Sequence, residues 1–149
     1  MQYWFYHLEN ASIEATLAPL LEKCQSAGWR ALVRSPNRER LAFLDDYLWS
    51  YRQNSWLPHA RTGEGVDEAR QPILLTQGMV NHNQAQALFL LDAAELGDTS
   101  GIERAFLVFD GNDEAMLKAA RAEWKRGQGL DYEMAYWQQS DKGKWEKKV

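Results

Sequence analysis

The fold class follows from residues 104–129, RAFLVFDGNDEAMLKAARAEWKRGQG. After Arg104, the next five residues form a continuous apolar run, which predicts a buried strand over residues 104–109 that ends at an Asp-Gly turn. Asp113 can then cap a long helix over residues 114–126, and two glycines close that helix. The stretch therefore predicts a covered strand followed directly by a helix, the repeating unit of an α/β domain.

Working outward, further apolar strands alternate with helices. The predicted strands are residues 2–8, 30–33, 73–75 and 87–91. Asn10 or Ser12 can cap a helix that runs toward Ala27, in which Pro19 can kink the helix or delay its start. Ser35 and Pro36 have the form of a second helix start, a capping hydroxyl followed by proline. Covered strands that alternate with helices favour a Rossmann-like, three-layer α/β/α sandwich with a mostly parallel sheet.

The C-terminal part continues this pattern and then becomes polar. Residues 132–137 alternate as an edge strand does, and we expect one domain over residues 1–139. Residues 140–149 are mostly charged, so we expect a flexible tail, although Trp145 can dock on the domain. The basic residues from Lys142 to Lys148 can attract acidic partners weakly and in a salt-sensitive way.

Composition limits the classes of function. With 149 residues and 45% hydrophobic content, the chain is long enough for one well-packed domain. A net charge of −4 argues against a wide, sequence-independent grip on DNA, which requires a field of lysine and arginine. One cysteine excludes an internal disulfide, and neither a signal peptide nor a membrane-spanning run is present. We therefore expect a soluble, cytoplasmic protein.

Residues for catalysis or cofactor binding do not cluster in the sequence. No glycine-rich phosphate loop occurs, and Gly63-Glu64-Gly65 is a weak match without a flanking strand and helix. The three histidines are scattered, Cys24 lies in an apolar helix, and Asp45 and Asp46 cannot face one another on a helix. No metal or cofactor is expected. A small Rossmann-like nucleotide-binding enzyme is the alternative to a binding protein.

Aromatic side chains gather in LAFLDDYLWSYRQNSWLPHARTGEG, residues 41–65. Leu41, Leu44 and Leu48 give the buried face of a helix, and Trp49, Tyr51 and Trp56 follow within eight residues. Tryptophan and tyrosine are enriched at protein interfaces because they offer a large apolar area with few rotamers. The segment indicates either a contact surface or an ordinary helix end with an irregular core.

A basic stripe lies on the helix predicted over residues 114–126. Lys118, Arg121 and Lys125 recur at i, i+3 and i+7, so they share one face, and Trp124 flanks it. This pattern suits a short acidic peptide with an apolar end, because arginine can pair with a carboxylate while the ring packs on the apolar side chain. The alternative is a solvated helix face with Trp124 in the core.

The whole chain resembles the chi subunit of bacterial DNA polymerase III. The resemblance rests chiefly on FLDDYLWSYRQNSWLPHARTGEG (residues 43–65) and on the run from Arg104 through ARAEWKRGQGLDYEMAYWQ. It implies a non-catalytic adaptor of the clamp loader that binds the psi subunit and the acidic, Pro-Phe-terminated tail of single-stranded-DNA-binding protein during DNA replication. It implies neither sequence-specific nucleic-acid binding nor membrane association.

The resemblance also assigns residues to the two partners. The psi contact would involve Trp49, Trp56, Leu57 and Pro58, and the tail would be bound by Lys118, Arg121, Trp124 and Lys125. The chain departs from the family pattern at two positions. Leu117 stands where a basic residue is expected one turn before Arg121. Asp110 stands at the mouth of the strand, where an apolar residue would suit the tail better.

Overall fold

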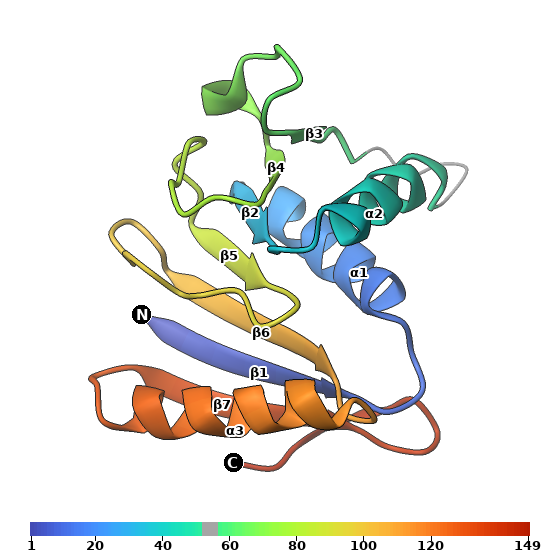
Figure 1. The fold of residues 1–149 in the computed structure, drawn as a ribbon, viewed down its shortest axis with the longest axis vertical. Coiled ribbons are helices and arrows are strands. Elements are labelled where there is room, and N and C mark those ends of the chain that lie inside the picture. The colour runs from blue at the N-terminus through green and yellow to red at the C-terminus, as the bar shows by residue number, and fades with distance from the viewer. Residues whose placement is uncertain (52–56) are drawn as a thin grey trace.

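The structure of the chain is a computed structural model that describes residues 1–51 and 57–149. The strands and helices follow one another from the N-terminus as Figure 1 labels them: β1 (Gln2–Leu8), α1 (Ile13–Ser26), β2 (Ala31–Arg34), α2 (Arg38–Ser50), β3 (Ala60–Arg61), the 3-10 helix η1 (Glu68–Arg70), β4 (Ile73–Thr76), β5 (Ala87–Leu90), β6 (Arg104–Asp110), α3 (Glu114–Gln128), β7 (Glu133–Gln139) and β8 (Trp145–Lys147).

A single sheet contains the eight strands of the described residues in the order β3-β4-β2-β5-β6-β1-β7-β8. Every neighbouring pair is parallel except β7 and β8, which are antiparallel. The long strand β1 lies between β6 and β7, so strands from both ends of the chain are neighbours in the part of the sheet near β8. The predicted α/β class with a mostly parallel sheet is confirmed.

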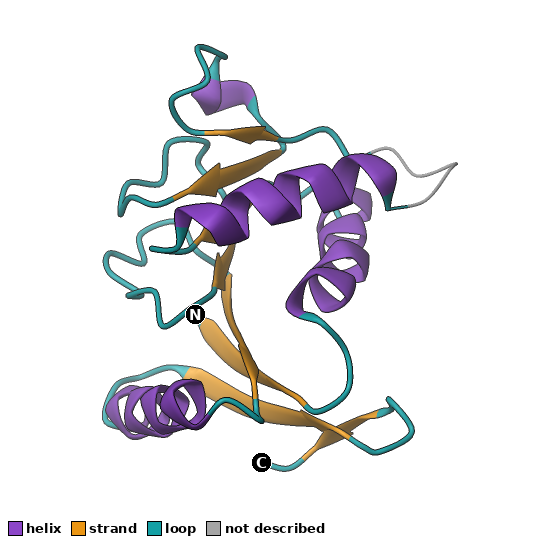
Figure 2. Cartoon of the chain, turned by 45° about the vertical axis from the view of Figure 1, so that its right-hand side comes forward, coloured by secondary structure: helices purple, strands orange, loops and turns teal. Residues whose placement is uncertain are grey.

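Helices cover both faces of this sheet, as the two views show (Figures 1 and 2). One buried cluster contains Leu17 and Leu21 of α1 and Leu44 of α2, which pack on the sheet with Val33. The other contains Ala120 of α3 with Phe5 and Phe109. Because side chains alternate between the faces of a strand, neighbouring residues of β1 contribute to opposite clusters. The three-layer arrangement follows from this alternation.

Each long helix begins at a side-chain cap. Ser12 Oγ accepts the backbone N–H of Ala15 at 3.1 Å, and Asp113 Oδ1 accepts that of Ala115 at 3.0 Å. Pro19 lies inside α1 without delaying its start at Ile13. These two starts agree with the sequence prediction.

The start of α2 differs from the prediction. Asn37, not Ser35, is the N-cap, and Pro36 precedes the helix instead of occupying its first position. The hydroxyl of Ser35 instead donates to Asp92 Oδ2 at 2.6 Å and accepts the N–H of Asn37. A contact 57 residues away therefore overrides the local capping pattern.

Two short strands were also missed. β3 and η1 lie between residues 60 and 70, where neither a strand nor a helix is predicted from the sequence. β7 is not the edge strand, because β8 pairs with it on the outer side. The segment expected to be a flexible tail therefore contributes Trp145–Lys147 to the sheet, and the Trp145 ring docks on Tyr6 with centroids 5.1 Å apart.

Two arginines, the buried Arg34 and the half-buried Arg40, join loops and helices at the ends of the strands. Arg34, which is 2% exposed, donates to the carbonyl oxygens of four residues in two loops: Gly78, Met79, Glu95 and Leu96. Arg40 in the first turn of α2 donates to Glu14 Oε1 at 2.7 Å and to Asp92 Oδ2 at 3.2 Å. These contacts fix α2 against α1 and against the loop after β5.

Candidate protein-interaction surfaces

The C-terminal half of α2 presents large apolar side chains to solvent. Trp49 is 55% exposed, and its indole stacks on the imidazole of His59 with ring centroids 4.1 Å apart. Phe43 on the same helix is 60% exposed. Exposed aromatics of this size in a helix whose other face is buried indicate a contact surface, which we call the α2 surface and define by Phe43, Trp49 and Pro58.

His59 supports this surface from beneath. Its side chain is buried, with Nδ1 2.7 Å from the carbonyl oxygen of Leu57 and Nε2 2.8 Å from Asp45 Oδ1. Both ring nitrogens therefore have partners within the fold, so the histidine has a structural role. Its ring packs beneath the indole of Trp49 at the surface.

The residues predicted to contact psi are only partly brought together. Trp49 is exposed and Pro58 is half-buried, whereas Leu57 is 2% exposed and packs in the core. Trp56 lies outside the described residues. Phe43 was not singled out from the sequence, although its position off the stripe formed by Leu41, Leu44 and Leu48 was a usable signal for exposure.

A second surface lies on α3, where the predicted basic stripe is exposed as expected. Lys118, Arg121 and Lys125 form no ion pair with another residue of the described ranges. The neighbouring Arg126, in contrast, pairs with Glu123, with Nε 3.0 Å from Oε2. Three cations on one helix face are therefore available to an external anion.

Trp124 fills the seam between this stripe and the sheet. It is half-buried, and its ring meets Phe5 and Tyr136 edge-on with centroids 5.1 Å and 5.5 Å away. The indole thus packs on the core and remains partly exposed beside the stripe. We call Lys118, Arg121, Trp124 and Lys125 the α3 surface.

A hydrogen-bonded chain borders the α3 surface. The hydroxyl of Tyr136 lies 2.7 Å from His7 Nδ1, and His7 Nε2 lies 2.9 Å from Glu9 Oε1. Burial raises the pKa of Tyr136, and the nearby charge of Arg121 acts in the opposite direction. A Cβ at Gly111 would lie 1.9 Å from His7 Nε2, so only glycine leaves room for this histidine. The border is therefore rigid and packed.

The comparison with protein families decides between the classes of function. The family model described as DNA polymerase III chi subunit, HolC, matches residues 1–135. The chain belongs to this chi subunit family. A curated relative named probable DNA polymerase III subunit chi, from Rickettsia prowazekii (strain Madrid E), is 23% identical over 108 residues, which is 72% of this chain. The match spans 65% of the length of that relative.

Two positions at which the chain departs from the expected chi pattern have structural roles. Leu117 is half-buried and packs on the cluster beneath α3. Asp110 is exposed, and its Oδ1 accepts the backbone N–H of Asn112 at 2.9 Å, which stabilises the turn between β6 and α3. Neither residue adds positive charge, so Arg121 is the central cation of the α3 surface in this member of the chi family.

The alternative of a nucleotide-binding enzyme is not favoured by membership of the chi family. The Gly63–Gly65 loop does follow a short strand and precede η1, contrary to the sequence prediction. The backbone N–H of Gly63 in this loop already donates to Glu68 Oε1 at 3.4 Å, and that of Arg61 at the end of β3 donates to Glu64 Oε1 at 2.7 Å. These two N–H groups are therefore engaged by carboxylates and are not free to bind a phosphate.

Two further features bear on chemistry. Burial raises the pKa of the Cys24 thiol to about 11, which keeps it an unreactive apolar side chain. Within residues 1–51 and 57–149, no group of three or more acidic, histidine or cysteine side chains is placed to hold a metal ion. No helix in these same ranges has the length and apolar character needed to cross a membrane.

Proposed function

We propose that this chain is a non-catalytic accessory subunit of the DNA polymerase III clamp loader, acting in the cytoplasm during DNA replication. It bridges the psi subunit, bound at the α2 surface, to the acidic C-terminal tail of single-stranded-DNA-binding protein, bound at the α3 surface. The observation that supports the proposal is the placement, beside the half-buried Trp124, of three exposed cations that form no ion pair with a described residue.

The α3 surface suits a peptide that ends in an apolar residue. The guanidinium of Arg121 can donate two parallel hydrogen bonds to the terminal carboxylate, while the final ring packs between Leu117 and Trp124. Lys118 and Lys125 extend the positive charge along the helix toward the acidic residues that precede the end of the tail. The two sites lie on helices that cover opposite faces of the sheet, so both partners can be held at once.

Replacing Arg121 with alanine is expected to weaken binding of the tail peptide at least tenfold, since a charge-assisted pair contributes about 1.5–3 kcal/mol. Fluorescence anisotropy of a labelled tail peptide, at two salt concentrations, measures this effect. Arg126→Ala is the matched control, because Arg126 lies on the same helix and is already paired with Glu123. Equal losses in both variants, or no saturable binding by the unmodified protein, would refute the tail site.

Replacing Trp49 with alanine is expected to weaken binding of the psi subunit by about 30-fold, the effect of losing a well-supported aromatic anchor. Isothermal titration of psi from the same organism measures it. Trp49→Ala should leave tail binding unchanged, and Arg121→Ala should leave psi binding unchanged. If either variant lost both activities together, the proposed separation of the two surfaces would be wrong.

A further inference from the structure

An aromatic groove lies on the face of the sheet that α1 and α2 cover, at a distance from the α3 surface. It consists of two adjoining cavities of about 360 and 560 Å³ between α1 and the strands β1, β6, β7 and β8. Both cavities are bordered by Trp4, Tyr6, Leu20 and Lys23. The groove arises because α1 leaves part of the sheet face beyond β1 uncovered.

Aromatic rings line the groove from end to end. Four indoles belong to it, together with one phenol and one phenyl ring: Trp4, Trp29, Trp137, Trp145, Tyr6 and Phe106. The four tryptophans are half-buried, so each keeps some exposed ring area. Trp4 and Trp137 on neighbouring strands have ring centroids 6.1 Å apart. The two indoles are tilted by 51° to one another and do not form a parallel stack.

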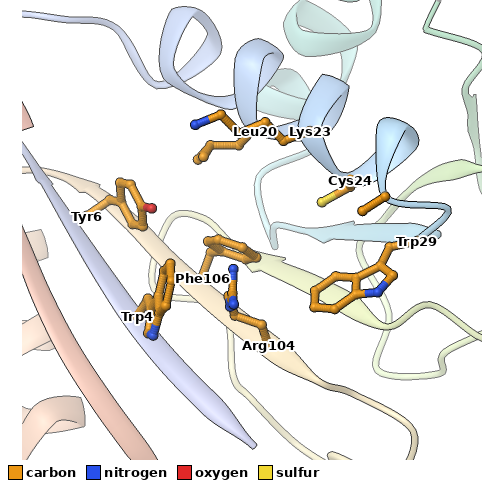
Figure 3. Close-up of a pocket in the computed structure, with 9 residues that line it drawn as sticks. Trp4, Tyr6, Leu20, Lys23, Cys24, Trp29, Arg104 and Phe106 are labelled. Atoms are coloured by element: carbon orange, nitrogen blue, oxygen red, sulfur yellow. The ribbon is translucent and has the colours of Figure 1, made fainter.

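Arg104 places a positive charge among these rings. Its guanidinium carbon lies 3.7 Å from the centroid of the Trp4 ring and 5.6 Å from that of Trp29. Figure 3 shows the guanidinium between the two indoles, directed from β6 toward α1. Nε donates to Gln2 Oε1 at 2.7 Å, and the guanidinium forms no ion pair with any described residue. Its terminal nitrogens are left for another acceptor.

A second cation stands on the opposite wall. Lys23, in the last turn of α1, is exposed and forms no ion pair within the ranges that the structure describes. No carboxylate side chain is among the residues that line either cavity. Lys144 precedes Trp145 and Lys147 follows it by two residues, while Glu146 between them pairs with Lys148. The groove is thus positive in a protein whose net charge is −4.

We propose that this groove binds single-stranded DNA without sequence preference. Each nucleotide carries one planar ring and one negative charge, which matches a surface where indoles and unpaired cations alternate. Bases would stack on Trp29 at one end of the groove and on Trp4 where the two cavities meet, and phosphates would lie between Arg104 and Lys23. An acidic peptide would satisfy the cations but would leave the row of aromatic faces without planar partners.

The test is fluorescence anisotropy of a 5′-labelled 20-nucleotide oligothymidylate titrated with the purified chain. The salt concentration is varied from about 25 to about 200 mM, a range in which phosphate contacts change the affinity measurably. Saturable binding is expected, and Lys23→Gln should weaken it about fivefold or more. Two phosphate contacts predict a slope of about −1.4 in log K against log salt, and Lys23→Gln should reduce this by about 0.7. Lys118→Gln on α3 is the matched control and should change neither quantity.

Two further arms separate stacking from charge. An abasic oligomer of equal length should bind about tenfold more weakly than oligothymidylate, and so should Arg104→Gln with the intact oligomer. Because Arg104→Gln can loosen the fold, its thermal midpoint is measured alongside, and Lys23→Gln, an exposed helix position, tests the groove independently. Binding of the acidic tail peptide at the α3 surface should be unchanged in both variants.

Three outcomes would overturn the proposal. The first is that oligothymidylate does not bind at about 25 mM salt, where phosphate contacts are strongest. The second is that the abasic oligomer binds as tightly as oligothymidylate, because the groove would then recognise charge alone and no base would stack on its rings. Equal losses in Lys23→Gln and Lys118→Gln are the third. Loss of tail-peptide binding in Lys23→Gln would instead assign the groove to a protein partner.

Discussion

Arg34→Met is expected to lower the free energy of unfolding by about 3–5 kcal/mol. Arg34 is 2% exposed and donates to four carbonyl oxygens in two separate loops, at distances of 2.8–3.1 Å. Methionine fills a similar length but donates to none of them. The loss is large because the carbonyls keep their desolvation penalty when the donor is removed.

The buried guanidinium of Arg34 is held by dipoles and not by a carboxylate. Burial lowers its pKa, and no ion pair with a described residue offsets that effect. The four carbonyls instead surround the charge and fix residues 78–79 against residues 95–96. Arg34 therefore acts as the tie between the loop after β4 and the loop after β5.

Urea denaturation followed by circular dichroism measures this effect of Arg34. The matched control is Arg38→Met, an exposed arginine in the first turn of α2, for which a change within about 0.5 kcal/mol is expected. A loss below about 1 kcal/mol for Arg34→Met would mean that water replaces the guanidinium without penalty, and that the two loops need no tie.

Much of this fold was predictable because its strands are short, continuous apolar runs. The run at residues 104–109 became β6, and ALFLL became β5, because a strand buried on both faces needs no polar alternation. β3 and β8 are two and three residues long, and their stability comes from the strand beside them. Local sequence carries little information about such pairing, which explains why both were missed.

Of the interaction surfaces, one could be predicted from the sequence and another could not. The basic stripe on α3 was predictable because its residues share one helix, so their spacing fixes their direction. The aromatic groove was not, since Trp4, Trp29, Arg104 and Trp137 are far apart in the chain. They come together only because β1 pairs with both β6 and β7. Sequence spacing describes a single helix well and a parallel sheet poorly.

Arg40→Met is the second large effect, with an expected loss of about 3–5 kcal/mol in the free energy of unfolding. Arg40 pairs with Glu14, which is 4% exposed, and with Asp92, whose carboxylate also accepts from Ser35. Burial acts to lower the pKa of Arg40, but the bonds to the two carboxylates outweigh it and raise the pKa. Without the guanidinium, Glu14 is left as a buried charge with no partner.

The size of this effect depends on Glu14, which a double-mutant cycle isolates. Glu14→Gln removes the charge that Arg40→Met strands, so the double variant should be more stable than the sum of the single losses predicts, by about 1–3 kcal/mol. Additive losses would place the stabilisation in packing instead of the ion pair.

Because Arg40 lies in the first turn of α2, the same variants also test whether its contacts with Glu14 and Asp92 position the α2 surface. If they do, Arg40→Met should weaken psi binding while the double variant regains part of it.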